Sequence, residues 1–351
     1  QKRTPIVNTL EEAKKLEGFL DDKTAKVTLT EFLRNDPTFA SNILLGVKLF
    51  PFQHMLIKGM FNTDYFMGIL SRASSKCLKH NGLVQSDKGL KRIIDIEVGD
   101  KILSKNGYNL VEDKVVNPKE KTYGVRTKGG YECEGLDYHR VQILNPETLE
   151  AEWKFVKDIK VGEVLVMKKG GYEFPSIGWD FRDENEKDIH FNAKQFYPKN
   201  ASLEDWYYFF GLLLGDGCMR ENLVSITNQE PEIIVFLEEF FNKLSLHYNK
   251  IDKGNNTYEI RATSKIFVQF LEKIGFRIVK ANKKSLPLPL THASKECLAA
   301  FLKGLYDTDG YCSLGSKNRG TEKRFNGTVG FTSTSEELLR LVRNLLLMFG
   351  I

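Results

Sequence analysis

The chain has 351 residues, which is enough for two or three domains, and its 41% hydrophobic and 28% charged residues are typical of a globular protein. Its longest apolar run, 206–214, is too short to cross a bilayer, and no charged-then-apolar leader opens the sequence. We therefore expect no membrane partner and a cytoplasmic location. A net charge of +5 permits nucleic-acid binding without requiring it. The cysteines form no CxxC pair, which argues against structural zinc and for a reducing compartment.

A strand is predicted over residues 64–70, and the polar segment SRASSK, 71–76, follows it directly. A strand that runs into a small-residue loop ending in lysine is the layout of a phosphate-binding P-loop. Leu70 and Ser75 stand where this pattern has glycine, and Cys77 stands where it has Ser or Thr. The alternative interpretation is a solvated polar turn.

Together with Phe52-Gln53, this stretch resembles the start of the large terminase subunit ATPase of tailed phages, a family that accepts degenerate P-loops carrying an arginine. The resemblance implies a partial α/β P-loop segment over 1–76 and the cytoplasm of a phage-infected or virus-infected cell. It also implies that Gln53, Arg72 and Lys76 bind ATP with Mg²⁺, once an insertion beginning at Cys77 has been removed.

From residue 77 to about residue 168 the sequence changes to short predicted strands and turns. CLKHNGLVQSDKGLKRIIDIEVGDKIL resembles the first block of an intein, and GYECEGLDYHRVQIL, 130–144, resembles the second block. The VGE of 153–167 repeats the VGD of the first block. The resemblance implies the N-terminal part of an all-β Hint splicing domain over 77–168.

In an intein the opening cysteine attacks the preceding carbonyl, so the resemblance assigns Cys77 as the nucleophile at Lys76 and needs no cofactor. His139 takes the place of the block histidine, which assists departure of the amide nitrogen. Leu136 stands where the family usually has threonine, and loss of that hydroxyl would slow the first step or leave it to other groups. The alternatives are a buried, inert Cys77 and a structural core histidine at His139.

The polar stretch 168–200 contains Gly170-Gly171, two prolines and the run WDFRDENEKD. We interpret 169–200 as a linker or a small DNA-contacting excursion. Of the two, a solvated connector is the simpler expectation.

Two short apolar helices are predicted in WYYFFGLLLGDGCM, 206–219, and LAAFLKGLYDTDGYC, 298–312, and each stops at an Asp-Gly pair. The glycines within the helices would let the two backbones approach closely, which would bring Asp216 and Asp309 together. Two adjacent carboxylates repel unless a cation lies between them, and Mg²⁺ is the default choice for oxygen ligands. The alternative is a pair of buried helices with acidic C-caps.

FFGLLLGDG and LKGLYDTDG resemble the two motifs of a LAGLIDADG (DOD-type) homing endonuclease. The resemblance implies that Asp216 and Asp309 hold the metals that cleave double-stranded DNA at a long site in the uninterrupted host gene. It also implies an α+β fold with pseudo-two-fold repeats, which we expect to act as a monomer.

The sequences after the two aspartates repeat a strand, a turn and a helix, so that Ile226-Thr227 corresponds to Phe331-Thr332. The second repeat is longer by the basic stretch 316–327, which we predict to be a loop. Its Lys317, Arg319, Lys323 and Arg324 are candidate phosphate contacts. Lys284, in KKSLP, matches the family's Lys-x-Ile-Pro block and is a candidate catalytic lysine; the alternative is a basic loop.

The sequence thus predicts a multidomain chain: an ATPase segment (1–76), a partial Hint domain (77–168), a linker (169–200) and a LAGLIDADG endonuclease (201–351). Since the chain lacks an initial methionine and stops within an apolar helical pattern, we expect a fragment with a truncated second repeat. The alternative function is a degenerate DNA-binding intein that has lost splicing or cleavage.

Overall fold

The computed structural model describes residues 78–114, 116, 121–185, 196–319 and 322–351. Gln53, Arg72, Lys76 and Cys77, with the predicted P-loop, lie outside the described residues. The described residues all belong to one compact unit.

Residues 78–168 contain short strands and 3-10 turns, with no α-helix in the part that the structure describes. Strands β1 (Leu83–Ser86), β2 (Gly89–Arg92), β3 (Lys101–Ser104) and β4 (Gly107–Leu110) form a sheet in the order β2-β1-β3-β4. A hairpin of β5 (Tyr123–Arg126) and β6 (Glu132–Gly135) follows. A further sheet pairs β7 (Arg140–Leu144) with β8 (Ala151–Phe155) and β9 (Val164–Leu165). The predicted strand-and-turn pattern is therefore present.

The turn into β2 lies against the segment that precedes α8. Gly89 has a φ of +87°, and a Cβ at this position would come within 2.6 Å of the His292 backbone nitrogen. The next residue, Leu90, donates its N–H to Thr291 Oγ1 over 2.7 Å, and both residues are buried. Glycine is therefore required here both by the backbone conformation and by the close approach.

The described part of 169–200 differs from the solvated connector that we expected. Tyr172, Phe181 and Phe196 are buried in the main hydrophobic core, and the Phe181 ring meets Trp206 edge-on at a centroid distance of 5.8 Å. The abundance of charged and proline residues concealed these aromatic anchors. The segment is therefore part of the folded unit.

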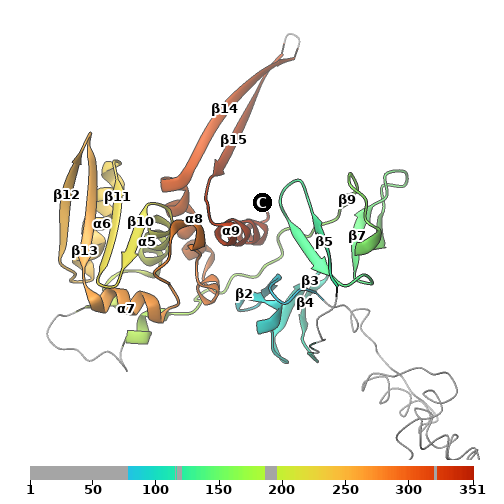
Figure 1. The fold of residues 1–351 in the computed structure, drawn as a ribbon, viewed down its shortest axis with the longest axis horizontal. Helices are drawn as coiled ribbons and strands as arrows, with labels where there is room; N and C mark the ends of the chain where they lie inside the picture. Colours follow the sequence, from blue (N-terminus) through green and yellow to red (C-terminus); the bar gives the residue numbers. More distant parts are fainter. Residues whose placement is uncertain (1–77, 115, 117–120, 186–195, 320–321) are drawn as a thin grey trace, which may run out of the picture. The chain divides into compact units, whose positions relative to one another are not determined.

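The first repeat begins with helix α5 (Leu203–Gly215), followed by β10 (Gly217–Arg220), β11 (Leu223–Asn228) and α6 (Pro231–Lys243). Strands β12 (Tyr248–Gly254) and β13 (Thr257–Thr263) and helix α7 (Lys265–Lys273) complete it. The strands form an antiparallel sheet in the order β10-β11-β13-β12, which α5, α6 and α7 contact (Figure 1). The core between them is dominated by aromatic side chains: Trp206, Phe209, Phe210, Phe240, Phe267 and Phe270.

The second repeat consists of α8 (Lys295–Asp309), β14 (Gly310–Arg319), β15 (Glu322–Phe331) and α9 (Glu336–Phe349). The predicted correspondence between the repeats is confirmed by the strand register. Gly217 pairs with Ile226 in the first repeat, and Gly310 pairs with Phe331 in the second.

The prediction that 316–327 form a basic loop is wrong. Strands β14 and β15 continue pairing along their whole length as a long hairpin, with Lys317 opposite Arg324 and Asn318 opposite Lys323 (Figure 1). The extra length of the second repeat therefore extends a β-ribbon. Among the residues that the structure describes, no helix is long and apolar enough to cross a membrane.

Candidate active site at the ends of two paired helices

Both site helices begin with a side-chain cap. Ser202 accepts a hydrogen bond from Asp205 N at 3.0 Å, and Asp205 accepts one from Ser202 N at 3.4 Å, which together form a capping box at the start of α5. Ser294 accepts from Cys297 N at the start of α8. These caps fix where each helix begins. Helix α5 then ends at Gly215 with Asp216 as its C-cap, and α8 ends at Asp309.

The two helices pack against each other through their glycines, as the sequence predicts. A Cβ added to Gly211 would lie 2.3 Å from Phe301 O, and one added to Gly304 would lie 2.3 Å from Tyr208 O. Gly215 similarly faces Thr308, whose Oγ1 would be 2.0 Å from an added Cβ. Since two of these contacts are to backbone oxygen, no larger residue fits without moving a helix.

This packing brings the carboxylates of Asp216 and Asp309 into one site. Partial desolvation raises the pKa of Asp216, although Asn228 donates to its Oδ2 over 2.9 Å and the residue remains exposed. Desolvation, followed by the negative charge of Asp216, raises the pKa of Asp309. Two carboxylates that each disfavour ionisation in this way form a site suited to a bound cation.

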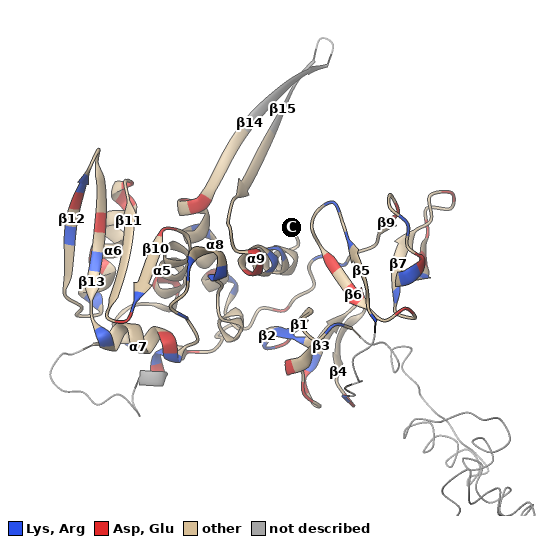
Figure 2. Cartoon of the chain, in the orientation of Figure 1, with Lys and Arg blue, Asp and Glu red and all other residues tan. Residues whose placement is uncertain are grey.

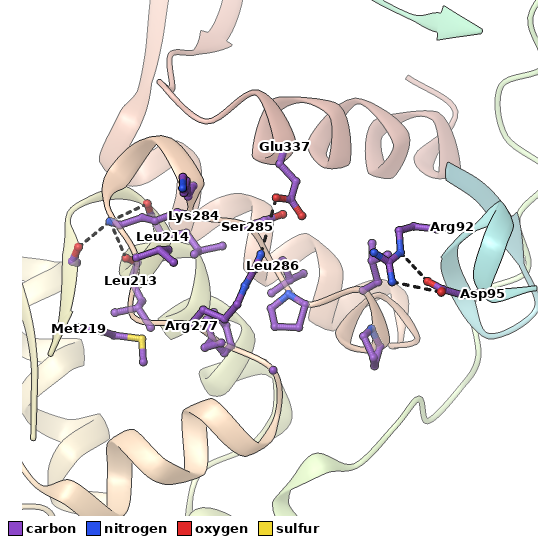
Figure 3. Close-up of a pocket in the computed structure, with 18 residues that line it drawn as sticks. Arg92, Asp95, Leu213, Leu214, Met219, Arg277, Lys284, Ser285, Leu286 and Glu337 are labelled. Carbon is purple, nitrogen blue, oxygen red and sulfur yellow. Dashed lines mark hydrogen bonds and ion pairs between the residues drawn. The ribbon is translucent and has the colours of Figure 1, made fainter. Parts of the chain in front are cut away.

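Lys284 also belongs to this site. It follows the short 3-10 helix Ala281–Lys283, and its Nζ donates to the carbonyl oxygens of Leu213 (3.3 Å) and Leu214 (3.2 Å) near the end of α5 (Figure 3). Nζ also donates to Gly215 O (3.2 Å), the last residue of α5, and to Gly217 O (2.6 Å) at the start of β10. Burial lowers the pKa of Lys284, whereas the charges of Asp309, Cys218 and Asp216 raise it. The lysine also lines a cavity of about 420 Å³.

The donor set fits a hard divalent cation held in part by the protein. Within the described ranges no group of three or more His, Cys, Asp and Glu side chains could hold a metal. The two carboxylates would therefore need further oxygen ligands from backbone carbonyls, water or a bound phosphate, which Mg²⁺ and Mn²⁺ accept. The raised pKa of Asp309 beside Asp216 is the observation that supports this fit.

The candidate splicing residues are placed only in part, because Cys77 lies outside the described residues. Leu78, the next residue, forms a β-bridge with Gly135 at the end of β6, and Lys79 N donates to Glu134 O over 2.9 Å. His139 is buried, and its backbone N donates to Leu136 O over 2.9 Å. The residue that follows the candidate nucleophile therefore pairs with the end of β6, and the candidate histidine lies in the turn directly after β6.

A charged cluster on the sheet was not predicted from the sequence. Charged residues of both signs lie along β12 and β13 (Figure 2). Among them, Glu259 accepts hydrogen bonds from Lys253 at 2.7 Å and from Arg261 at 2.9 Å. The hydrogen bond from Lys253, with those from Arg261 and Ser225, lowers the pKa of Glu259 to about 2. Alternating polar residues in TYEIRAT were the available signal.

One of the two carboxylates, Asp309, lies in a segment that matches a known protein family. Residues 296–351, which span α8 to α9, match the LAGLIDADG-like domain family. The chain is 25% identical over 297 residues to the DNA-directed RNA polymerase subunit Rpo1C of Methanocaldococcus jannaschii, covering 75% of this chain and 32% of that protein. It is 26% identical over 232 residues to the replication factor C small subunit of the same organism, covering 65% and 10%.

The chain thus spans about a third or less of these two curated relatives. Among solved structures, it is similar to the gp41-1 intein, at 28% identity and a TM-score of 0.21, covering 28% of this chain and 66% of that chain. It is also similar to the LAGLIDADG meganuclease I-AabMI bound to uncleaved DNA, at 14% identity and a TM-score of 0.29, covering 41% and 72%.

Proposed function

We propose that this chain is an intein with an embedded LAGLIDADG homing endonuclease, which cleaves double-stranded DNA and splices itself from a host protein. The observation that carries the proposal is the convergence of Asp216 and Asp309 at the ends of two glycine-packed helices, one of which lies in the family match. The similarity to two proteins with different names, over a small share of each, is what an inserted segment would produce.

In the nuclease reaction, a water oxygen attacks a backbone phosphorus and the bond to the sugar oxygen breaks, leaving a phosphate end and a hydroxyl end. Asp216 and Asp309 would hold a divalent cation such as Mg²⁺, which stabilises negative charge on the phosphate and lowers the pKa of bound water. The protein's own part is to place the two carboxylates and to bind DNA. The paired strands β14 and β15 carry Lys317, Arg319, Lys323 and Arg324, which we propose as phosphate contacts.

In the splicing reaction, Cys77 Sγ forms a bond to the carbonyl carbon of Lys76 and the Lys76–Cys77 C–N bond breaks. The thiol loses its proton and the released α-amino group gains one, with His139 as the proton donor. The product of this first step is a thioester. The host is proposed to be a terminase-like ATPase in which Gln53, Arg72 and Lys76 bind ATP, and this part rests on the sequence pattern alone.

Cleavage is tested with the protein expressed from its complete gene and a duplex carrying the host gene without the insertion. Asp216→Asn and Asp309→Asn are each expected to reduce cleavage by at least about 100-fold in Mg²⁺. The matched control is Asp307→Asn, which changes an exposed carboxylate on the same helix α8. Cleavage that survives in the Asp216→Asn/Asp309→Asn double variant would remove these residues from the mechanism.

Thioester formation is tested by treating the purified chain with dithiothreitol and following its mass. The reagent should release residues 1–76 from the wild type, whereas Cys77→Ala should stay intact. Cys312→Ala removes a different, exposed thiol on β14 and should cleave like the wild type. If the wild type resists dithiothreitol as the Cys77 variant does, the splicing half of the proposal fails while the nuclease half still stands.

A further inference from the structure

Lys284 supplies hydrogen-bond donors to the carbonyl groups at the end of α5. The last four carbonyl groups of an α-helix have no partner within the helix. In α5 the first of these, Leu212 O, accepts from Asp216 N, which leaves three carbonyls without a helical donor. Lys284 Nζ donates to these three, those of Leu213, Leu214 and Gly215, and to Gly217 O beyond them.

These four contacts use the whole hydrogen-bonding capacity of the Lys284 ammonium group. An ammonium group has three N–H donors, and four backbone oxygens already lie within 3.3 Å of Nζ. Its charge also neutralises the negative end of the helix dipole, next to Asp216. The lysine therefore holds the backbone on both sides of Asp216 and has no donor left over for a substrate.

The backbone of Lys284 is fixed in turn by the second repeat. Ser335, the N-cap of α9, is fully buried and donates its hydroxyl to Lys284 O over 2.6 Å. The same hydroxyl accepts from Leu338 N at the start of α9. Lys284 is thus attached by its side chain to the first repeat and by its backbone to the second.

We propose that Lys284 and Ser335 are positioning residues that hold the Asp216 carboxylate in register for a divalent cation, and that Lys284 does not touch DNA. The inference rests on the proposed endonuclease function. It assigns Lys284 a role different from the catalytic lysine that the sequence resemblance implies. It also makes the first carboxylate depend on the start of α9 in the other repeat.

The test is Mn²⁺ binding to the full-length protein, measured by electron paramagnetic resonance with and without host-gene duplex, alongside DNA cleavage. Lys284→Met should weaken Mn²⁺ binding by about 10-fold or more. A purely electrostatic role predicts the opposite sign, because removal of a positive charge near the carboxylates would tighten cation binding. Ser335→Ala should weaken Mn²⁺ binding by a smaller factor, about threefold.

Lys283→Met is the matched control, since Lys283 is exposed and adjacent in sequence, and it should bind Mn²⁺ within about twofold of the wild type. If Lys284→Met unfolds the site, as circular dichroism would show, Ser335→Ala and Lys284→Arg provide the same comparison. Unchanged or tighter Mn²⁺ binding with slower cleavage in the Lys284 variants would overturn the positioning role alone. A wild type that neither binds Mn²⁺ nor cleaves would overturn the proposed function as well.

Discussion

Gly211 of α5 and Gly304 of α8 face each other where the two site helices pack, and a Cβ on Gly304 would come within 3.2 Å of Gly211 Cα. Each glycine also faces a backbone carbonyl of the other helix at a distance that no Cβ tolerates. The two helices can therefore pack this closely only because Gly211 and Gly304 have no Cβ, and this packing determines how near Asp216 lies to Asp309.

We predict that Gly211→Ala and Gly304→Ala each lower the free energy of unfolding by about 1–3 kcal/mol, because the obstacle is backbone and only a shift of a helix removes it. Urea denaturation measures the change. Gly124→Ala in β5 is the control, since its added Cβ would meet only Glu134 Cγ at 3.9 Å. Equal stability of the Gly211 and Gly124 variants would show that the helices are not packed as described.

The paired carboxylates should cost stability when no cation is bound. Asp309 ends α8, where the helix dipole is negative, and its pKa is raised by desolvation and by Asp216. We predict that Asp309→Asn raises the free energy of unfolding by about 0.5–1 kcal/mol at neutral pH in the absence of divalent cations.

The variant should be more stable because the pKa of Asp309 is raised in the folded protein, which means that the fold disfavours the ionised carboxylate that Asn replaces. The gain should shrink as the pH falls through the carboxyl range, and added Ca²⁺ should stabilise the wild type more than the variant. Asp307→Asn is the comparison, since it loses the ion pair with Lys303 and should not gain stability. A destabilised Asp309→Asn variant would contradict the prediction.

The parts of the site that could be predicted are those with local signals. An apolar run, internal glycines and a terminal Asp-Gly pair lie within one stretch of sequence, so the packing of α5 against α8 through their glycines and the repeat correspondence could be read directly. The short strands in 78–168 could be predicted for the same reason, because short runs of strand-forming residues between glycine-containing turns indicate strands.

The parts that could not be predicted depend on tertiary contacts. The polar stretch 316–327 has residues typical of loops, yet strand pairing along the hairpin overrides that propensity. The partners of Lys284 are carbonyl groups about 70 positions earlier in the chain, at sequence separations of 67 to 71. No composition or spacing encodes a contact to a carbonyl, because every residue carries one. Ser335 was missed for the same reason.

Glu259 should make stability depend on pH in the acid range. Lys253 and Arg261 hold its pKa at about 2 against an ordinary value of 4.5. A depressed acid pKa contributes stability above the unfolded value, and that contribution is lost as the pH falls from about 4.5 toward about 2. Because both cations are more than a third exposed, we expect Glu259→Gln to cost about 2 kcal/mol at pH 7 rather than the full shift.

The difference in free energy of unfolding between wild type and Glu259→Gln should therefore shrink as the pH falls below about 4.5 and approach zero only below about pH 2. Glu336→Gln removes the exposed partner of Arg340 and should change stability by less than about 0.5 kcal/mol at any pH. A Glu259 effect of the same size at pH 2.5 and pH 7 would mean that charge is not its cause.

Leu136 offers a direct test of the splicing half of the proposal. It is buried, with 4% of its surface exposed, and its carbonyl accepts from His139 N. The position is the one at which the intein resemblance places threonine, so the chain has an apolar side chain where a hydroxyl would assist the first step. We predict that Leu136→Thr accelerates release of residues 1–76 by dithiothreitol by roughly tenfold, the factor that one hydrogen bond of about 1.4 kcal/mol would provide.

Leu136→Val is the control that distinguishes the effect of the hydroxyl from the effect of a smaller, branched side chain, since valine and threonine have nearly the same volume and branching. Both variants lose apolar contact and should unfold more easily than the wild type, by about 1–2 kcal/mol. Only the threonine should speed the reaction, and the Val variant should react at the wild-type rate or more slowly. Equal rates for Thr and Val would show that position 136 acts through packing around His139, and the first step would then depend on groups other than a hydroxyl at this position.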